Sequence, residues 1–207
     1  MKLIILGATG SLGRHLVEQA LAQGEDVTAF LRDASKLDRD HQNLRLIEGD
    51  VLNPAAVDAA VKGHDAVLIA LGAGRKGGVR AQGTKHIIEA MERHNVRRLV
   101  CQTTLGAGDS HKHLDFFWKH IMFGWLLKQA MADHEEQEAF ITQSKLDWTT
   151  VRPAAFTDGP VTGDYKLGFP PSESSLALKI SRADVASVML QQLATDTYLH
   201  KSPGLSY

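Results

Sequence analysis

The feature that most constrains this chain is a glycine-rich turn that directly follows its first apolar run. Residues 2–6 are almost entirely apolar and predict a strand that is buried on both faces. The turn reads Gly7-Ala8-Thr9-Gly10-Ser11-Leu12-Gly13, and residues 11–23 then carry apolar side chains at helical spacing. Glycines at these spacings allow a tight bend, a close approach of backbone to ligand, and close packing of helix on strand. We therefore expect a strand–turn–helix unit whose helix presents its free N–H groups and positive dipole end to phosphates.

Strand-like and helix-like segments alternate along most of the remaining chain. Short apolar runs predict strands at 27–31, 44–47, 66–71, 98–103 and 148–151. Helices are predicted from Pro54 to the residue before Gly63, at about 82–94, and at about 115–143. Strands that are apolar along their whole length indicate a parallel sheet covered by helices on both faces. The predicted fold is α/β, a Rossmann-type doubly wound parallel sheet.

The pattern changes after Pro153, where glycine and proline punctuate short segments. Residues 179–181 are expected to be extended and residues 184–193 helical. About fifty residues are too few for a second independent core. We expect one domain over residues 1–207, in which residues 154–207 form a small cap over the carboxyl ends of the strands, where ligands bind in such sheets.

Composition excludes several classes of protein. The 207 residues include 23 Lys and Arg against 24 Asp and Glu, so no global basic field exists to hold nucleic acid. A single cysteine excludes a disulfide framework and a cysteine-based zinc site, and it fits a reducing compartment. No apolar run reaches the roughly 18 residues of a membrane span, and the first residues are too short an apolar run for a signal peptide. We expect a cytoplasmic protein without a nucleic-acid partner.

The residue at the end of the second strand bears on which dinucleotide such a turn would hold. Arg32 lies nineteen residues after Gly13, where NAD-binding proteins place an acidic residue on the ribose 2′-hydroxyl, and Lys36 follows one helical turn later. A guanidinium there suits a 2′-phosphate. Arg32 could instead be a solvated charge paired with Asp33, and Arg14 could add a second cation or face solvent. The sequence favours NADPH (NADP+) over NADH.

Several motifs together resemble a known family. They are the glycine-rich turn, Leu31-Arg32-Asp33, Gly49-Asp50-Val51, Asp147-Trp148-Thr149-Thr150-Val151-Arg152-Pro153, Pro160-Val161-Thr162-Gly163-Asp164-Tyr165 and Ile180-Ser181-Arg182-Ala183-Asp184-Val185. With these, nearly the whole chain is similar to the atypical short-chain dehydrogenases/reductases. The most similar group holds NAD(P)H-dependent flavin reductase/biliverdin reductase B and NmrA-like proteins.

The resemblance implies positions for the cofactor-binding residues. Asp50 and Val51 would lie beside the adenine, and Leu71 and Gly72 beside the cofactor ribose. A further set would surround the nicotinamide and the phosphates: Thr103 and Thr104 near the nicotinamide, Pro153 and Ala154 on its carboxamide side, and Arg75 near the phosphates. Asp50 could also be an ordinary turn aspartate, and the two threonines could serve only β propensity.

The chain lacks the tyrosine–lysine pair of typical short-chain dehydrogenases. Its tyrosines are Tyr165, Tyr198 and Tyr207, all beyond the helix that would carry the pair. Flavin reduction needs no such acid, because a hydride moves between two stacked rings that the protein only aligns. In the related biliverdin/flavin reductases a serine lies where Thr104 stands, and a substrate-pocket histidine falls on Ala155. Thr104 is therefore a candidate catalytic hydroxyl, and biliverdin specificity is not supported.

His134 is the remaining ionisable candidate. It precedes Glu135, Glu136 and Glu138, and we expect this acidic cluster to raise the histidine pKa and hold a proton near neutrality. Relatives carry histidine at this position. The alternative is a solvated histidine on an acidic helix face.

Three functions compete. The first is an NADPH-dependent oxidoreductase that transfers a hydride to a flavin, quinone, tetrapyrrole-like or other planar acceptor. The second is a non-enzymatic, NADP-binding, redox-sensing regulator of the NmrA type. Regulators of this type usually have a longer C-terminal part, so the short cap favours the reductase. The third, a sugar-nucleotide epimerase or dehydratase, is disfavoured by the missing tyrosine.

Two further segments leave alternatives open. Asp109, His111, His113 and Asp115 lie in one loop without a distant ligand, so we expect no metal site. Residues 116–127 hold five of the thirteen aromatic side chains, and apolar residues there cover more than one helical face. This stretch could pack in the core and against the cap, line a pocket for a flat aromatic substrate, or form a surface for a second copy or another partner. We expect a monomer or weak homodimer.

Overall fold

The computed structural model describes residues 1–37, 39–72, 74, 77–113, 122, 126–170, 173 and 175–207. Within them, eight strands form one sheet in the order β3-β2-β1-β4-β5-β6-β10-β8. Neighbouring strands are parallel except for the pair β10 and β8. The strands are β1 (Lys2–Leu6), β2 (Asp26–Leu31), β3 (Leu44–Glu48), β4 (Ala66–Ile69), β5 (Arg98–Gln102), β6 (Asp147–Pro153), β8 (Lys166–Leu167) and β10 (Gly204–Ser206). The predicted Rossmann-type α/β fold is confirmed.

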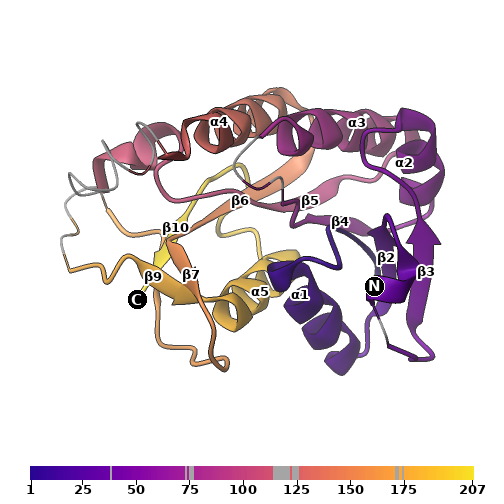
Figure 1. Ribbon diagram of the computed structural model, residues 1–207, viewed down its shortest axis with the longest axis horizontal. Helices are drawn as coiled ribbons and strands as arrows, with labels where there is room; N and C mark the ends of the chain where they lie inside the picture. The colour runs from indigo at the N-terminus through magenta and orange to yellow at the C-terminus, as the bar shows by residue number, and fades with distance from the viewer. Residues whose placement is uncertain are drawn as a thin grey trace.

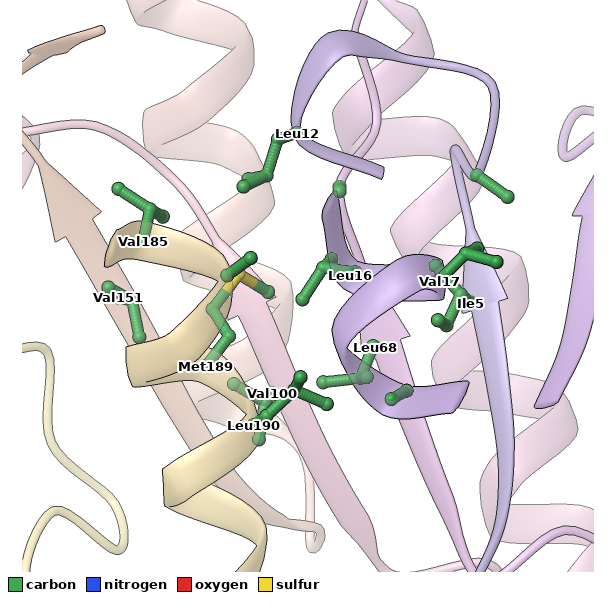
Figure 2. Close-up of a cluster of buried hydrophobic side chains, with 14 of the residues drawn as sticks. Ile5, Leu12, Leu16, Val17, Leu68, Val100, Val151, Val185, Met189 and Leu190 are labelled. Atoms are coloured by element: carbon green, nitrogen blue, oxygen red, sulfur yellow. The ribbon is translucent and has the colours of Figure 1, made fainter. Parts of the chain in front are cut away.

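Helices cover both faces of this sheet, as the wholly apolar strands require. Figure 1 shows α2 (Pro54–Val61), α3 (Val79–His94) and α4 (Lys128–Gln143) along one face and α1 (Ser11–Ala22) with α5 (Arg182–Gln191) on the other. Each face has its own buried cluster of apolar side chains. Figure 2 shows the cluster between α1, α5 and the sheet, which includes Ile5, Leu12, Leu16, Val17, Leu68, Val100, Val151, Val185, Met189 and Leu190.

The C-terminal region, which was expected to form only a cap, also extends the main sheet. β10 pairs with β6 and β8 with β10, so this region widens the main sheet, and α5 packs on α1 to bury one face. β7 (Ala155–Thr157) and β9 (Lys179–Ser181) pair with each other in a separate two-stranded sheet, and Ala155, Phe156 and Leu178 border the ligand side. Residues 154–207 therefore complete the sheet and its helical layer as well as bordering the ligand side, because β6 would otherwise be left as an unpaired edge.

A buried aspartate holds the region together. Asp184, fully buried in the first turn of α5, accepts hydrogen bonds from the backbone N–H of Thr162 (2.8 Å) and Gly163 (3.0 Å) and from the hydroxyl of Tyr207 (2.6 Å). These donors hold the pKa of Asp184 below its usual value against the opposing effect of burial. One carboxylate thus ties a loop, a helix and the C-terminal strand together.

Two boundaries differ from the sequence prediction in ways that affect the site. β4 ends at Ile69, so Ala70 and Leu71 leave the sheet and border the ligand cleft. α4 begins at Lys128. Of the first part (115–127) of the helix predicted over about 115–143, which includes the aromatic stretch, the structure describes only Met122, Leu126 and Leu127. In the part of the chain that the structure describes, none of the helices combines the length and apolar character that crossing a bilayer requires.

Candidate nucleotide-binding and acceptor site

The strand order places a cleft at the carboxyl ends of β1 and β4. From β1 the chain proceeds to β2 and β3 on one side, and then returns to β4, β5 and β6 on the other. Ligands of doubly wound sheets bind at such a switch point. Two cavities of about 490 Å³ and about 410 Å³ lie there, and they share Gly10, Ala70, Leu71 and Gly72. The cleft is thus one continuous groove with two lobes.

The glycine-rich turn forms the floor of this groove by close backbone packing. Gly7 has φ +91°, and a Cβ atom on it would lie 2.3 Å from the carbonyl oxygen of Ala70. A Cβ atom on Gly13 would lie 2.1 Å from the carbonyl oxygen of Gly7. Neither position can carry a side chain unless the backbone moves. The first and third glycines therefore bring α1 against the strand ends, as the spacing predicts.

The first turn of α1 is open to an anion. The N-cap residue is Gly10, which has no side chain with which to cap the helix, and the first turn carries no acidic residue. Ser11 and Leu12, the first two residues of the helix, line the 410 Å³ lobe, and Thr9 lines the 490 Å³ lobe. Uncapped N–H groups and the positive end of the helix dipole suit a pyrophosphate at the junction of the two lobes.

The 490 Å³ lobe contains the residues expected near the adenine end. Asp50 and Val51 line it, and the Asp50 carboxylate accepts a hydrogen bond of 2.9 Å from the backbone N–H of Leu52. Asp50 is thus a turn aspartate that also borders the lobe. Val51 is buried and packs on Gly83 of α3.

Arg32 lines the same lobe and is exposed. The alternative in which it pairs with Asp33 does not occur in the described structure. Asp33 instead accepts hydrogen bonds from the backbone and hydroxyl of Ser35 (3.1 and 2.6 Å) and lies 3.6 Å from the Lys36 ammonium. These contacts lower the pKa of Asp33, with the Ser35 hydroxyl as the largest cause of lowering. Lys36 is not among the residues that line either lobe.

Arg14 connects the two sides of this lobe. Its Nε donates to the carbonyl oxygen of Thr9 (3.2 Å), and its Nη2 donates to the carbonyl oxygen of Lys36. The guanidinium therefore ties the glycine-rich turn to the segment after β2, the 3-10 helix Ala34–Lys36. It also adds positive charge between them.

The 410 Å³ lobe is bordered largely by apolar groups. Its lining residues include Leu105, Leu127, Pro153, Ala154, Ala155, Phe156 and Leu178. Thr104 borders it too, and the one hydrogen bond that its Oγ1 makes with the described residues is long, at 3.3 Å to the carbonyl oxygen of Leu105. The hydroxyl of Thr103 donates to Glu138 at 2.7 Å and is fully buried, so its proton is already committed. Of the two threonines, Thr104 has the hydroxyl that is better placed to meet a ligand.

A buried ion-pair network behind Thr103 was missed by sequence reasoning. Arg152 donates to both carboxylate oxygens of Glu138, from Nε at 2.9 Å and from Nη2 at 2.6 Å, and from Nη1 to Asp109 at 2.5 Å. Side-chain exposure is 7% for Arg152 and 8% for Glu138. The sequence did carry a signal for this network, because an arginine in a strand that is buried on both faces needs a buried carboxylate partner.

The expectation that the acidic cluster raises the pKa of His134 is wrong. Only 7% of this residue is exposed, and burial, with the positive charge of Arg80 nearby, lowers the pKa of its imidazole to about 4. Glu135 and Glu136 point to solvent, and Glu138 is engaged with Arg152. Helical geometry separates what the sequence places side by side, so desolvation outweighs the acidic cluster. His134 does line the 410 Å³ lobe, but as a neutral imidazole.

Arg80 is a second residue that sequence reasoning missed. It lies in the first turn of α3 and lines the 410 Å³ lobe. Asp133 of α4 accepts hydrogen bonds from Nη1 of Arg80 (3.3 Å) and from the backbone N–H of Ala81 (3.0 Å). The aspartate thus caps α3 and fixes the arginine. The two residues are 53 positions apart, and nothing in the local sequence pattern connects them.

Two expectations fall partly or wholly on residues that are not described. Arg75 lies outside the described residues, as does Asp115 in the histidine-containing loop. Among the residues described, no group of three or more His, Cys, Asp or Glu side chains is placed to hold a metal ion. Asp109 pairs with Arg152 instead.

Comparison with known proteins identifies the family. Residues 7–196 match the model of a family described as NAD(P)H-binding. The chain belongs to this NAD(P)H-binding family. The match spans both lobes of the groove, and it confirms the expectation of an NAD(P)H-binding protein that the motifs indicated.

Relatives and solved structures of this type cover most of the chain. YwnB of Bacillus subtilis, an uncharacterized protein, is 31% identical over 183 residues, which are 81% of this chain and 79% of YwnB. A short-chain dehydrogenase/reductase from Veillonella parvula, solved in complex with NADP, has a TM-score of 0.85 at 21% identity and covers 99% of this chain and 94% of its own. ChuY, an anaerobillin reductase from Escherichia coli O157:H7, has a TM-score of 0.80 at 23% identity, covering 99% and 96%. The likeness to these two structures concerns the fold.

Proposed function

We propose that this protein is an NADPH-dependent reductase that transfers a hydride to a planar conjugated acceptor such as a flavin, a quinone or a tetrapyrrole-like molecule. One observation carries the proposal. The groove that suits the dinucleotide opens directly into the largely apolar 410 Å³ lobe, and the described residues that line this lobe include no tyrosine and no lysine. Such a lobe suits the stacking of a flat molecule, and it does not suit the tyrosine-dependent chemistry of alcohols and carbonyls.

The groove fits the cofactor that the family binds. The uncapped N–H groups of α1 would hold the pyrophosphate, with Thr9, Gly10, Ser11 and Leu12 around it. Asp50 and Val51 would border the adenine. Leu71 and Gly72, which line both lobes, would lie beside the ribose. Arg32, with Arg14 behind it, would meet the 2′-phosphate, and this is the reason to prefer NADPH over NADH. Bound NADPH supplies the hydride.

The remaining residues act by position and by exclusion of water. Pro153 and Ala154 would border the carboxamide side of the nicotinamide, and the Thr104 hydroxyl would orient the nicotinamide ring. The apolar wall formed by Leu105, Phe156 and Leu178 keeps water from the space between the rings. Because His134 is neutral at physiological pH, the proton that completes reduction comes from solvent and not from an imidazolium.

Cofactor titration tests the first half of the proposal. Dissociation constants for NADPH and NADH are measured by protein fluorescence, and we expect NADPH to bind at least about tenfold tighter, which corresponds to about 1.4 kcal/mol. Arg32→Glu should abolish or reverse this preference, because a carboxylate repels the 2′-phosphate. Arg45→Glu is the matched control, since Arg45 is exposed on β3 and does not line the groove. Equal affinities in the unaltered protein would refute the assignment to Arg32.

Acceptor screening tests the second half. NADPH oxidation is followed with FMN, FAD and menadione as acceptors, and we expect turnover with at least one of them. Tight NADPH binding without reduction of any acceptor would instead favour a redox-sensing regulator of the NmrA type.

A further inference from the structure

The wall of the 410 Å³ lobe formed by α3 and α4 carries two polar side chains that the proposed hydride transfer does not use. These are Arg80 and His134. Asp133 holds the arginine through its Nη1, so the guanidinium cannot swing to solvent. The side chain of Arg80 is only 12% exposed and that of Asp133 only 1%. A fixed guanidinium and an imidazole therefore lie together at one edge of a largely apolar cavity.

Both side chains have unused hydrogen-bonding capacity. Nε of Arg80 and Nδ1 of His134 are buried, and neither makes a hydrogen bond of ordinary geometry with any described residue. Nη2 of Arg80 and Nε2 of His134 likewise make none within that part of the chain. Nε of Arg80 and Nδ1 of His134 are enclosed by protein. The nitrogens that remain available to a ligand in the cavity are therefore Nη2 of Arg80 and Nε2 of His134. Buried polar groups without partners are uncommon in folded proteins and indicate a place where a ligand or water completes the bonding.

The charge at this edge indicates which ligand group completes it. The positive charge of Arg80 is balanced by Asp133, and His134 carries no charge at neutral pH. A ligand carboxylate would therefore enter a site with no excess positive charge. The free-energy cost of removing that carboxylate from water would be largely without an offsetting attraction. A neutral carbonyl oxygen needs only hydrogen-bond donors, which the guanidinium supplies, as does the neutral imidazole in the tautomer that carries its proton on Nε2.

We infer that Arg80 and His134 form a recognition site for the carbonyl oxygen of the acceptor, so that the substrates are flat rings conjugated to a carbonyl, as in quinones and the isoalloxazine of flavins. This inference rests on the proposed function, and it narrows the acceptor class. It also makes Arg80 a determinant of specificity, because a flat ring without a carbonyl oxygen leaves these donors unpaired.

The same contact suits the reaction. When a quinone gains a hydride, which carries two electrons and one proton, NADPH leaves as NADP+ and the quinone becomes a monoanion whose negative charge lies on oxygen. That oxygen then takes one proton from water to give the hydroquinone. A guanidinium already in contact with the carbonyl oxygen stabilises the anion as it forms, without supplying the proton.

The test compares flat ligands that have a carbonyl with one that lacks it. Dissociation constants of menadione, lumiflavin and 2-methylnaphthalene, which has the ring skeleton of menadione without its carbonyl oxygens, are measured by fluorescence quenching on the NADP+-bound protein, where no turnover occurs. Arg80→Met should weaken the binding of menadione and lumiflavin at least about tenfold, about 1.4 kcal/mol, and should change the binding of 2-methylnaphthalene less than about twofold. Arg80→Lys should restore part of the loss, because the ammonium is still a donor.

The control is Arg93→Met, which makes the same substitution on the same helix at a residue paired with Asp58, far along α3 from the lobe. It should leave all three constants unchanged. NADP+ affinity and thermal melting establish that each variant is folded. The inference is overturned if Arg80→Met weakens the binding of 2-methylnaphthalene as much as that of menadione, or leaves the menadione dissociation constant within about twofold. Tight, Arg80-dependent binding of menadione without reduction by NADPH would refute the proposed reductase function while the carbonyl site stands.

Discussion

The buried, neutral state of His134 makes the stability of the protein depend on pH in a defined direction. In an unfolded chain the imidazole has its ordinary pKa of about 6.5, whereas in the folded protein burial lowers it to about 4. Above pH 6.5 neither state binds the proton. Between these two values the unfolded state binds it and the folded state does not. Stability therefore falls as the pH falls from about 6.5 to about 4, and this contribution stops changing below that.

The size of the effect follows from the difference between the two pKa values. A shift of one pKa unit corresponds to about 1.4 kcal/mol, so the change from about 6.5 to about 4 corresponds to roughly 3 kcal/mol in full. Linkage over the narrower interval from pH 7 to pH 5 gives about 2 kcal/mol. This interval is the better choice for measurement, because fewer carboxylates titrate there.

Urea denaturation at pH 7, 6 and 5 measures this contribution. We expect His134→Gln, which cannot be protonated, to lose about 2 kcal/mol less of its free energy of unfolding than the unaltered protein between pH 7 and pH 5. His111→Gln, at an exposed histidine, controls for removing an imidazole in general. Parallel pH profiles for the unaltered protein and His134→Gln would refute the reasoning, as would an NMR titration that places the His134 pKa above 6. Either result would restore the imidazolium as a candidate proton donor.

Two further predictions concern the same part of the molecule. Arg152→Met leaves the carboxylate of Glu138 buried without a cation and should lower the free energy of unfolding by about 3–5 kcal/mol. As a control, Arg97→Met removes an exposed pair with Asp147 and should lower it by less than about 1 kcal/mol. Equal losses in urea denaturation would contradict the importance of burial. Thr104→Val keeps the shape of the side chain and removes its hydroxyl, so the NADPH dissociation constant should stay within about twofold and turnover with a quinone should fall less than about a hundredfold. A loss beyond about a thousandfold would show that the hydroxyl takes part in proton transfer.

Local sequence determined the sheet and its phosphate-binding turn. Strands buried on both faces leave a run of apolar residues, and the close approaches at Gly7 and Gly13 admit no other residue type without movement of the backbone. Both signals lie within a few residues of one another. For the same reason the exposed Arg32 at the end of β2 could be placed beside the groove from its spacing alone.

The C-terminal region shows where local pattern is insufficient. Its short segments predicted a cap, but in the structure β10 pairs with β6 and α5 packs on α1. Strand pairing across about fifty residues depends on which edge of the sheet remains free, and that is known only when the other strands are in place.

The chemistry of the acceptor lobe was decided by tertiary structure. The neighbours of His134 in the sequence are acids, and these predicted a raised pKa. In the folded protein the imidazole is buried and lies near Arg80. Desolvation and the positive charge of Arg80 lower its pKa to about 4. The pairs Arg80–Asp133 and Glu138–Arg152 likewise join different elements of the fold. Electrostatic energies depend on distance and desolvation in the folded state, so the sequence could name the ionisable groups of this site, but only packing of α3, α4 and β6 set their charges and partners.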